Sequence, residues 1–194
     1  MSNQPSLPPK ILAREMTTAV EFKLTDLFRF NTINLDSLTE TYNNSFYAHY
    51  LACWPEYQVI LEHPDGRPMG YVLGKVEGKG ESWHGHVTAV TVAPPCRRIG
   101  IATRLMQLLE RISEFQHDGY FVDLFVRASN TVAIQMYQRM GYVVFRRVLD
   151  YYSGHDAEDA LDMRKALARD AQGKSVQTTP GATVRPQDLD EFYL

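Results

Sequence analysis

The stretch Val87-Thr-Ala-Val-Thr-Val92, followed by Ala93-Pro-Pro-Cys-Arg-Arg-Ile-Gly-Ile-Ala102, decides the fold of this 194-residue chain. The first six residues are apolar or β-branched and end just before Pro94 and Pro95, a pattern typical of a buried strand. Beyond them, apolar residues recur at helical spacing, at Ile101, Leu105, Leu108, Leu109 and Ile112. The sequence therefore predicts a strand, a basic loop and a helix in immediate succession.

The loop between this strand and this helix has the composition of an anion-binding site. A helix N-terminus offers backbone N–H groups and the positive end of its dipole. Gly100 permits close approach of an anion, Ala102 leaves that approach unobstructed, and Arg97 and Arg98 add charge. No Walker GK[ST] ending is present. Alone, the Arg-x-x-Gly-x-Ala pattern fits a surface loop equally well, but its position between strand and helix favours a phosphate site.

Composition limits the classes of function. With 44% hydrophobic residues, the chain can build one domain around one core. A net charge of −3 and a pI of about 6.1 give no indication of broad nucleic-acid or membrane binding. The two cysteines, Cys53 and Cys96, fit a reducing compartment, and Cys96 is either a reactive thiol or an incidental loop residue. We expect no membrane span and no secretory signal.

The expected organisation is one domain with two appended segments. Residues 1–15 are polar and carry prolines, which predicts a flexible N-terminal extension. Residues 16–169 form the domain. Residues 170–194 are rich in Gly, Thr, Pro, Gln and Asp, so we treat them as a tail without assigned structure.

Periodicity and turn residues predict a mixed set of strands and helices. Strands are expected at 17–22, 57–62, 68–76, 83–92, 119–126 and 142–148, with a last one at 160–166, and helices at 25–35, 46–54, from 101 and from 130. An acidic loop is expected at 155–159. Antiparallel hairpins first and crossovers later indicate a layered α/β domain and not a doubly wound Rossmann sheet.

The expected helix at 25–35, capped by Thr25-Asp26, has more apolar residues than one core contact needs. They are Leu27, Phe28, Phe30, Ile33 and Leu35. Either the helix is deeply buried, or part of its surface meets a partner chain.

Eight further segments carry a specific resemblance. They are Leu35–Tyr42, Trp54–Tyr57, Met69–Tyr71, Trp83–Ala89, Phe121–Arg127, Gly141–Tyr142, Tyr151–Tyr152 and Asp162–Leu167. In this order, and with the basic loop, they resemble the catalytic subunits of N-terminal acetyltransferase B (NatB) complexes, a branch of the GNAT superfamily. The resemblance covers about residues 16–169, and the basic loop resembles the GNAT loop that holds the acetyl-CoA pyrophosphate.

The resemblance implies a GNAT fold, which is a mixed, mostly antiparallel central sheet flanked by helices. It also implies transfer of acetyl from acetyl-CoA to the α-amine of proteins beginning Met-Asp, Met-Glu, Met-Asn or Met-Gln. It further implies a cytosolic enzyme with a large helical-repeat (TPR-like) auxiliary subunit that brings it to the ribosome, and no direct contact with nucleic acid or membrane.

The expected cofactor residues follow from this resemblance. Backbone N–H groups of Val90, Thr91 and Val92 would hold the thioester, and the pyrophosphate would bind at Arg97, Arg98, Ile99, Gly100, Ile101 and Ala102. Asn130 and Tyr137 are seven residues apart and so share one helix face, which GNAT relatives place against the cofactor.

The chemistry needs little from a base. An α-amine has a pKa of about 7.7–8.0, so a large fraction is neutral near physiological pH. The leaving thiolate does need a proton, and Tyr137 is a reasonable donor. Alternatively, Tyr137 packs by its ring in the core, and Asn130 is simply a helix cap.

His84 and His86 are two residues apart on a strand and so face one side. A metal site would need a third ligand, and none stands at matching spacing nearby, so we expect no metal. The two histidines then either pack against aromatic rings or contact the substrate. The resemblance favours His86 as the residue that recognises the second side chain of the substrate, since it can donate to Asp, Glu, Asn or Gln.

Two loops complete the expected site. The resemblance implies that Glu40 and Tyr42 in one loop, and Tyr151 and Tyr152 in a later one, close over the peptide. Aromatic rings would pack on the substrate methionine and a carboxylate would hold the amine, although any one tyrosine can equally be scaffolding.

Two other classes stay open beside an N-terminal acetyltransferase. A GNAT enzyme for lysine or a small amine more often carries a carboxylate base or an acidic trough, whereas these loops are aromatic. The intact loop and the pair Asn130 and Tyr137 argue weakly against the other class, a non-enzymatic CoA-binding subunit.

Overall fold

The computed structural model describes residues 17–29, 31–34, 39–154 and 157–189. The expected N-terminal extension, residues 1–15, lies outside the described residues. The chain divides into two compact units. Unit 1 combines residues up to 74 with 89–109, and unit 2 combines 75–88 with 110 onward.

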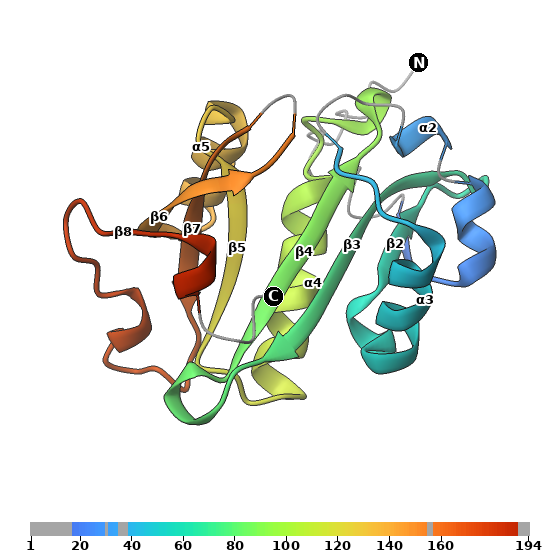
Figure 1. Ribbon diagram of the computed structural model, residues 1–194. Helices are drawn as coiled ribbons and strands as arrows, with labels where there is room; N and C mark the ends of the chain where they lie inside the picture. Colours follow the sequence, from blue (N-terminus) through green and yellow to red (C-terminus); the bar gives the residue numbers. More distant parts are fainter. Residues whose placement is uncertain (1–16, 30, 35–38, 155–156, 190–194) are drawn as a thin grey trace, which may run out of the picture. The chain divides into compact units, whose positions relative to one another are not determined.

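Eight strands form one sheet in the order β1-β2-β3-β4-β5-β7-β6-β8 (Figure 1). They are β1 Thr18–Glu21, β2 Val59–Glu62, β3 Pro68–Glu77, β4 His84–Val92, β5 Phe121–Arg127, β6 Val143–Tyr152, β7 Glu158–Ala166 and β8 Thr183–Val184. The pairs β1–β2, β2–β3, β5–β7 and β6–β7 are antiparallel, whereas β4–β5 and β6–β8 are parallel. The expected mixed, mostly antiparallel sheet is confirmed.

In unit 1, the predicted aromatic helix is α3, Asn44–Cys53. Asn43 caps it, because its Oδ1 accepts a hydrogen bond of 2.9 Å from the backbone N–H of Phe46. The helix ends where Pro55 follows Trp54. The predicted hairpin between β2 and β3 is also present, and Gly66 has the positive φ of 84° that its turn requires.

The helix expected at 25–35 is wrong in form. The structure has a 3₁₀ helix at Leu24–Arg29 and a short α2 at Asn31–Asn34. Asp26 does not cap a longer helix: its carboxylate accepts from the backbone N–H of Lys23 and pairs with Arg29, both at 2.8 Å. Lys23 and Arg29 are each three residues away from the buried Asp26. This spacing matches the three residues per turn of a 3₁₀ helix.

The apolar residues of this segment divide between core and surface. Ile33 is fully buried in a core cluster with Phe22, Ile60 and Tyr71, while Phe28 is 85% exposed. Phe30 and Leu35 lie outside the described residues. Deep burial is therefore confirmed for Ile33, whereas contact of the exposed side of the segment with a partner chain stays a prediction.

The helix expected from residue 101 is α4, Ile101–Phe115. Its buried positions include Ile101, Leu105 and Leu109, which confirms the spacing on which the prediction was based. Among the described residues, no helix is both long and apolar enough to cross a membrane.

In unit 2, α5 runs over Thr131–Arg139 and β6 is longer than expected. Tyr151 and Tyr152 therefore stand on a strand and not in a loop. The expected loop at 155–159 is shorter, since Glu158 and Asp159 belong to β7, and residues 155 and 156 lie outside the described residues. The antiparallel pairing of β6 with β7 orders these residues.

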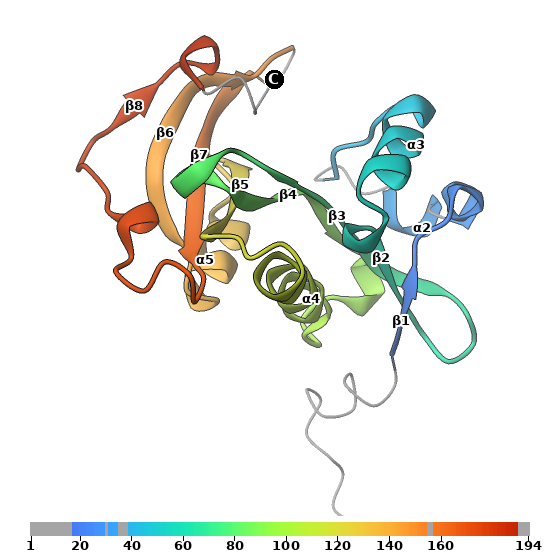
Figure 2. The same ribbon diagram turned by 90° about the horizontal axis from the view of Figure 1, so that it is seen from below.

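Part of the expected tail also has structure. The two-residue β8 pairs with β6, and Figure 2 shows it along the outer side of that strand. Leu189 is buried against Val148 and Ala160, and Asp170 accepts hydrogen bonds from the backbone of Lys174 and Ser175. A few specific contacts thus order a segment whose composition offers little apolar area.

Candidate active site

The basic loop in unit 1 has the backbone of an anion-binding turn. Arg98 and Gly100 have positive φ angles of 66° and 95° directly before α4 begins at Ile101. Left-handed residues at a helix N-terminus turn successive backbone N–H groups toward an anion. A Cβ built on Gly100 meets nothing within 4 Å, so the positive φ, and not crowding, requires glycine.

The side chains of the loop fit this assignment. Arg97 and Arg98 are exposed, and Arg97 Nε donates to the Val92 carbonyl oxygen (3.1 Å). Ile99 and Ala102 are half-buried, as are Val90 and Val92 on either side of the buried Thr91. Burial raises the pKa of the Cys96 thiol despite the charge of Arg67, which supports an incidental cysteine.

Gly70 supports the loop from β3, and the sequence analysis did not single it out. A Cβ there would lie 2.7 Å from the Thr91 carbonyl oxygen and 3.2 Å from the Ile101 side chain. The absence of a side chain therefore allows β3 to approach the end of β4 and the first turn of α4 closely.

In unit 2, Asn130 and Tyr137 lie on α5 as expected. Asn130 is the N-cap: its Oδ1 accepts from the backbone N–H of Ala133 at 3.1 Å. Tyr137 is 7% exposed and meets the ring of Tyr142 edge-on at 5.9 Å. Burial raises the pKa of Tyr137, so its hydroxyl keeps its proton at physiological pH.

His84 and His86 on β4 share a buried carboxylate on the neighbouring strand. Asp123 on β5 stands opposite His86 in register, and its Oδ1 lies 2.8 Å from His86 Nδ1 and 3.4 Å from His84 Nε2. Burial alone would raise the pKa of Asp123, but the two histidines hold it well below its usual range.

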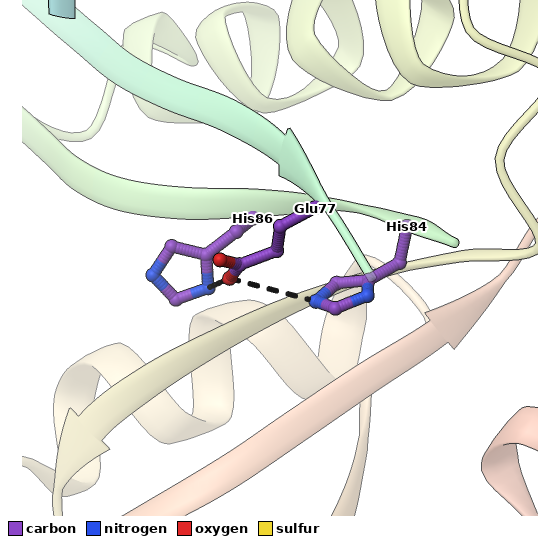
Figure 3. Close-up of side chains that lie close together, drawn as sticks. All are labelled: Glu77, His84 and His86. Atoms are coloured by element: carbon purple, nitrogen blue, oxygen red, sulfur yellow. Dashed lines mark ion pairs between the residues drawn. The ribbon is translucent and has the colours of Figure 1, made fainter. Parts of the chain in front are cut away.

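A second carboxylate comes from β3, as Figure 3 shows. Glu77 Oε1 lies 3.8 Å from both His84 Nε2 and His86 Nδ1, and its Oε2 pairs with Lys75 Nζ at 2.5 Å. The expectation that no acidic group stands near the two histidines was wrong. It counted neighbours along the chain, whereas Glu77 and Asp123 arrive from the adjoining strands.

These groups form a hydrogen-bonded network more readily than a metal site. Potential ligand atoms of Glu77, His84 and His86 do lie within 4.8 Å of one another. However, His86 Nδ1, the ring nitrogen nearest Glu77, is already at hydrogen-bonding distance from Asp123 Oδ1, and His84 Nε2 lies 3.4 Å from the same oxygen. Burial opposes a charge on His84, yet Asp123, Ser82 and Glu77 together raise its pKa. These contacts therefore favour a proton on His84.

A row of aromatic rings connects three of the expected site residues. The ring of His86 lies 5.7 Å from that of Phe125, Phe125 lies 4.8 Å from Tyr151, and Tyr151 lies 5.1 Å from Tyr152. Phe125 was missed, as was Asp123. Their signal in the sequence was the alternation Phe121-x-Asp123-x-Phe125, which puts an acid and two aromatics on one strand face.

Glu40 and Tyr42 belong to unit 1. Glu40 is exposed, and the ring of Tyr42 stacks on that of Phe46 at 4.1 Å and meets that of Tyr47 edge-on at 6.0 Å. Tyr42 is therefore part of an aromatic cluster with α3. That these residues and Tyr151–Tyr152 close over a substrate stays a prediction.

The fold and the loop before α4 define the class of protein. Residues 27–142 match the model of the acetyltransferase (GNAT) family, and the chain belongs to that family. The NatB catalytic subunit NAA20 of Arabidopsis thaliana is 62% identical over 161 residues, which are 83% of this chain and 91% of that protein. Within the GNAT family, the chain is thus a member of the branch of NatB catalytic subunits.

Solved structures agree. Naa20 of Chaetomium thermophilum in complex with a bisubstrate analogue has a TM-score of 0.82 at 40% identity, covering 88% of this chain and 97% of that one. A NatB complex bound to CoA and MES has a TM-score of 0.72 at 44% identity, covering 77% of this chain and 99% of that one.

Proposed function

We propose that this chain transfers acetyl from acetyl-CoA to the α-amine of proteins that begin Met-Asp, Met-Glu, Met-Asn or Met-Gln. It acts as the catalytic subunit of a heterodimer with a large helical-repeat, TPR-like subunit, in the cytosol and at the ribosome through that subunit. The observation that carries the peptide specificity is the aromatic row from His86 through Phe125 to Tyr151 and Tyr152. The aromatic rings suit an apolar first residue of the substrate, and the histidine at one end of the row suits a polar second residue.

Acetyl-CoA binds through backbone groups. The N–H groups of residues 97–102 hold the pyrophosphate. The Arg98–Gly100 turn and the N-terminus of α4 provide a positive electrostatic potential there. The backbone at Val90–Val92 holds the thioester and the oxyanion that develops on its carbonyl oxygen.

The reaction is a direct attack within a ternary complex. The neutral α-amine forms the new C–N bond, the C–S bond breaks, and the amine's surplus proton leaves to solvent. The CoA thiolate is the leaving group. Since burial raises the pKa of Tyr137, its hydroxyl donates a hydrogen bond to the departing sulfur without being ionised beforehand. Asn130 keeps its capping role and faces the cofactor with its amide.

The substrate is held by its first two residues. Tyr151 and Tyr152, with Phe125, pack on the methionine, and His86 recognises the second side chain. Glu40 holds the α-ammonium group before it loses its proton, and Tyr42 packs beside it. Aromatic packing supplies affinity here, while the polar contacts supply selectivity.

A peptide panel tests this function. The full chain, co-expressed with the helical-repeat subunit, is assayed with peptides beginning Met-Asp, Met-Asn, Met-Leu and Ser-Ala, with an N-terminally blocked lysine peptide and with spermidine. We expect acetylation of the first two at least tenfold faster than of the others. Comparable rates on the blocked lysine peptide or on spermidine would instead establish a GNAT enzyme for another amine.

A further inference from the structure

We propose that Leu189 is a positioning residue for Tyr151 and Tyr152, and that residues 183–189 thereby set the preference for the first residue of the substrate. The inference rests on the proposed function, in which the two rings pack on the substrate methionine, and deepens it. The segment belongs to residues 170–194, to which the sequence alone assigned no structure.

Leu189 belongs to the apolar cluster on which the aromatic row packs. It is 5% exposed and forms this cluster with Val148 of β6 and Ala160 of β7. The half-buried side chains packed against the cluster are Phe125, Tyr151, Tyr152 and Val184. The first three of these are the members of the row beyond His86. The C-terminal segment therefore supplies one of the three buried side chains that support the rings.

Backbone contacts bring Leu189 to this place. The strand β8 pairs in parallel with β6, where Val184 stands opposite Val148 (Figure 2). The 3₁₀ helix Pro186–Asp188 follows, and the backbone N–H of Leu189 donates to the Pro186 carbonyl oxygen at 3.2 Å. The edge of β6 thus sets the position of the segment, and a single turn returns the chain to the cluster.

The strand β6 is irregular directly before the two rings. Asp150 has a φ of 53°, in the left-handed region, which Asp adopts more readily than most residues. The register of β6 against β7 also shifts between Val148 and Tyr152. Such a shift turns the side chains that follow away from the regular alternation of a strand. The directions of Tyr151 and Tyr152 therefore depend on the contacts that hold this irregularity.

Two polar contacts hold Asp150, one of them from the C-terminal segment. Its backbone N–H donates to Asp159 Oδ1 at 2.8 Å, and its Oδ2 pairs with Arg185 Nη1 at 2.9 Å. Arg185 and Asp150 are both exposed, so their ion pair contributes little by itself. Burial of the Leu189 side chain removes apolar area from water and is the stronger contact of the segment.

The consequence concerns the first residue of the substrate. Rings that are already held in place bind a methionine more tightly, because no conformational entropy is lost in ordering them. An alanine in the first position is too short to use the same packing. Loss of the Leu189 side chain should therefore weaken peptides that begin with methionine and leave those that begin with alanine unaffected.

The test compares Leu189→Ala with the wild type, each as the full chain co-expressed with the helical-repeat subunit. Steady-state rates are measured on a Met-Asp peptide and on an Ala-Asp peptide of otherwise identical sequence. We expect KM for the Met-Asp peptide to rise by about three- to tenfold, the size of an aromatic contact, while kcat stays within about twofold. The value of kcat/KM for the Ala-Asp peptide should not change. A lower melting temperature with an unchanged ratio between the two peptides would show a merely structural role and overturn the inference.

Further variants keep the test decisive. Leu189→Met conserves the volume and should restore the wild-type KM, and failure to do so would contradict the packing argument. Leu189→Val removes one methylene and should change the ratio in the same direction by a smaller factor, so it decides the question if Leu189→Ala does not fold. Val176→Ala is the matched control, because Val176 is a half-buried aliphatic residue of the same segment, in the 3₁₀ helix Lys174–Val176. It should leave the ratio unchanged.

The wild type separates the two levels of the proposal. No acetylation of the Met-Asp peptide, or no preference for it over Ala-Asp, would count against the proposed function itself. A clear preference in the wild type that persists unchanged in Leu189→Ala and Leu189→Val would count only against the role of Leu189.

Discussion

At the scale of single residues, His86 carries the selectivity that we propose. It is 9% exposed and held from β5 by Asp123, so its ring is fixed before a substrate arrives. His84 differs, since it stacks face to face on Phe121 at 4.5 Å and is 1% exposed. The packing interpretation therefore suits His84, and substrate contact suits His86.

His86→Ala should reduce kcat/KM for Met-Asp peptides by about 1–3 kcal/mol, because a buried polar group of the substrate is left unpaired. The loss on a Met-Leu peptide should be much smaller. Initial rates below KM on both peptides, with the melting temperature of each protein, measure this effect. An equal loss on Met-Leu would show that His86 only supports the fold.

Tyr137→Phe keeps the buried ring that meets Tyr142 and removes only the hydroxyl. We expect kcat to fall by about 10- to 150-fold, the effect of about 1.5–3 kcal/mol for a hydrogen bond to a charged atom. The melting temperature should change little. Single-turnover rates with saturating acetyl-CoA isolate the chemical step. An unchanged rate would assign Tyr137 to packing alone.

At the scale of elements, the sequence predicts best what local pattern controls. The spacing of Ile101, Leu105 and Leu109 gave α4, and the residues around Gly66 gave the hairpin. It predicts worst what distant contacts control. The 3₁₀ helix at Leu24–Arg29 depends on the burial of Asp26, and β8 depends on the edge of β6.

The same distinction applies to the site. The loop before α4 and the cap at Asn130 were visible because each is a local motif. The cluster of His84 and His86 with Glu77 and Asp123 was not, because register between strands sets it. A charged residue in an apolar strand, as in Phe121-Val-Asp123-Leu-Phe125, was the available sign.

The loop before α4 gives the prediction at this scale. Gly100→Asp should abolish measurable CoA binding, because it adds a negative charge where the pyrophosphate binds and strains a φ of 95°. Gly66→Asp is the matched control: its φ is 84°, and a Cβ there also meets nothing within 4 Å. Both variants place Asp at a positive φ, but only the first should lose CoA binding in calorimetry. Equal CoA affinities for the two variants would contradict the assignment of the loop.

At the scale of the whole molecule, the two units carry different parts of the proposed function. Unit 1 holds the loop before α4 and the segment with Glu40 and Tyr42, and unit 2 holds α5 and the aromatic row. Among the described residues of unit 1, the large apolar side chains that are exposed belong to the 3₁₀ helix, where Phe28 is 85% and Leu24 is 49% exposed. Burying such side chains against a partner contributes about 1.5–3 kcal/mol each.

We therefore expect the 3₁₀ helix Leu24–Arg29 to contact the large subunit, and activity to depend on assembly. Phe28→Ser should weaken the complex and reduce turnover on Met-Asp peptides, because the interface also steadies the nearby segment with Glu40 and Tyr42. Phe115→Ser, at the end of α4 and 73% exposed in wild type, is the matched control and should assemble normally. Co-purification, oligomeric state, melting temperature and turnover are compared for the full chain alone and with its partner. A stable monomer with full activity on Met-Asp peptides, or equal assembly of both variants, would contradict this interface.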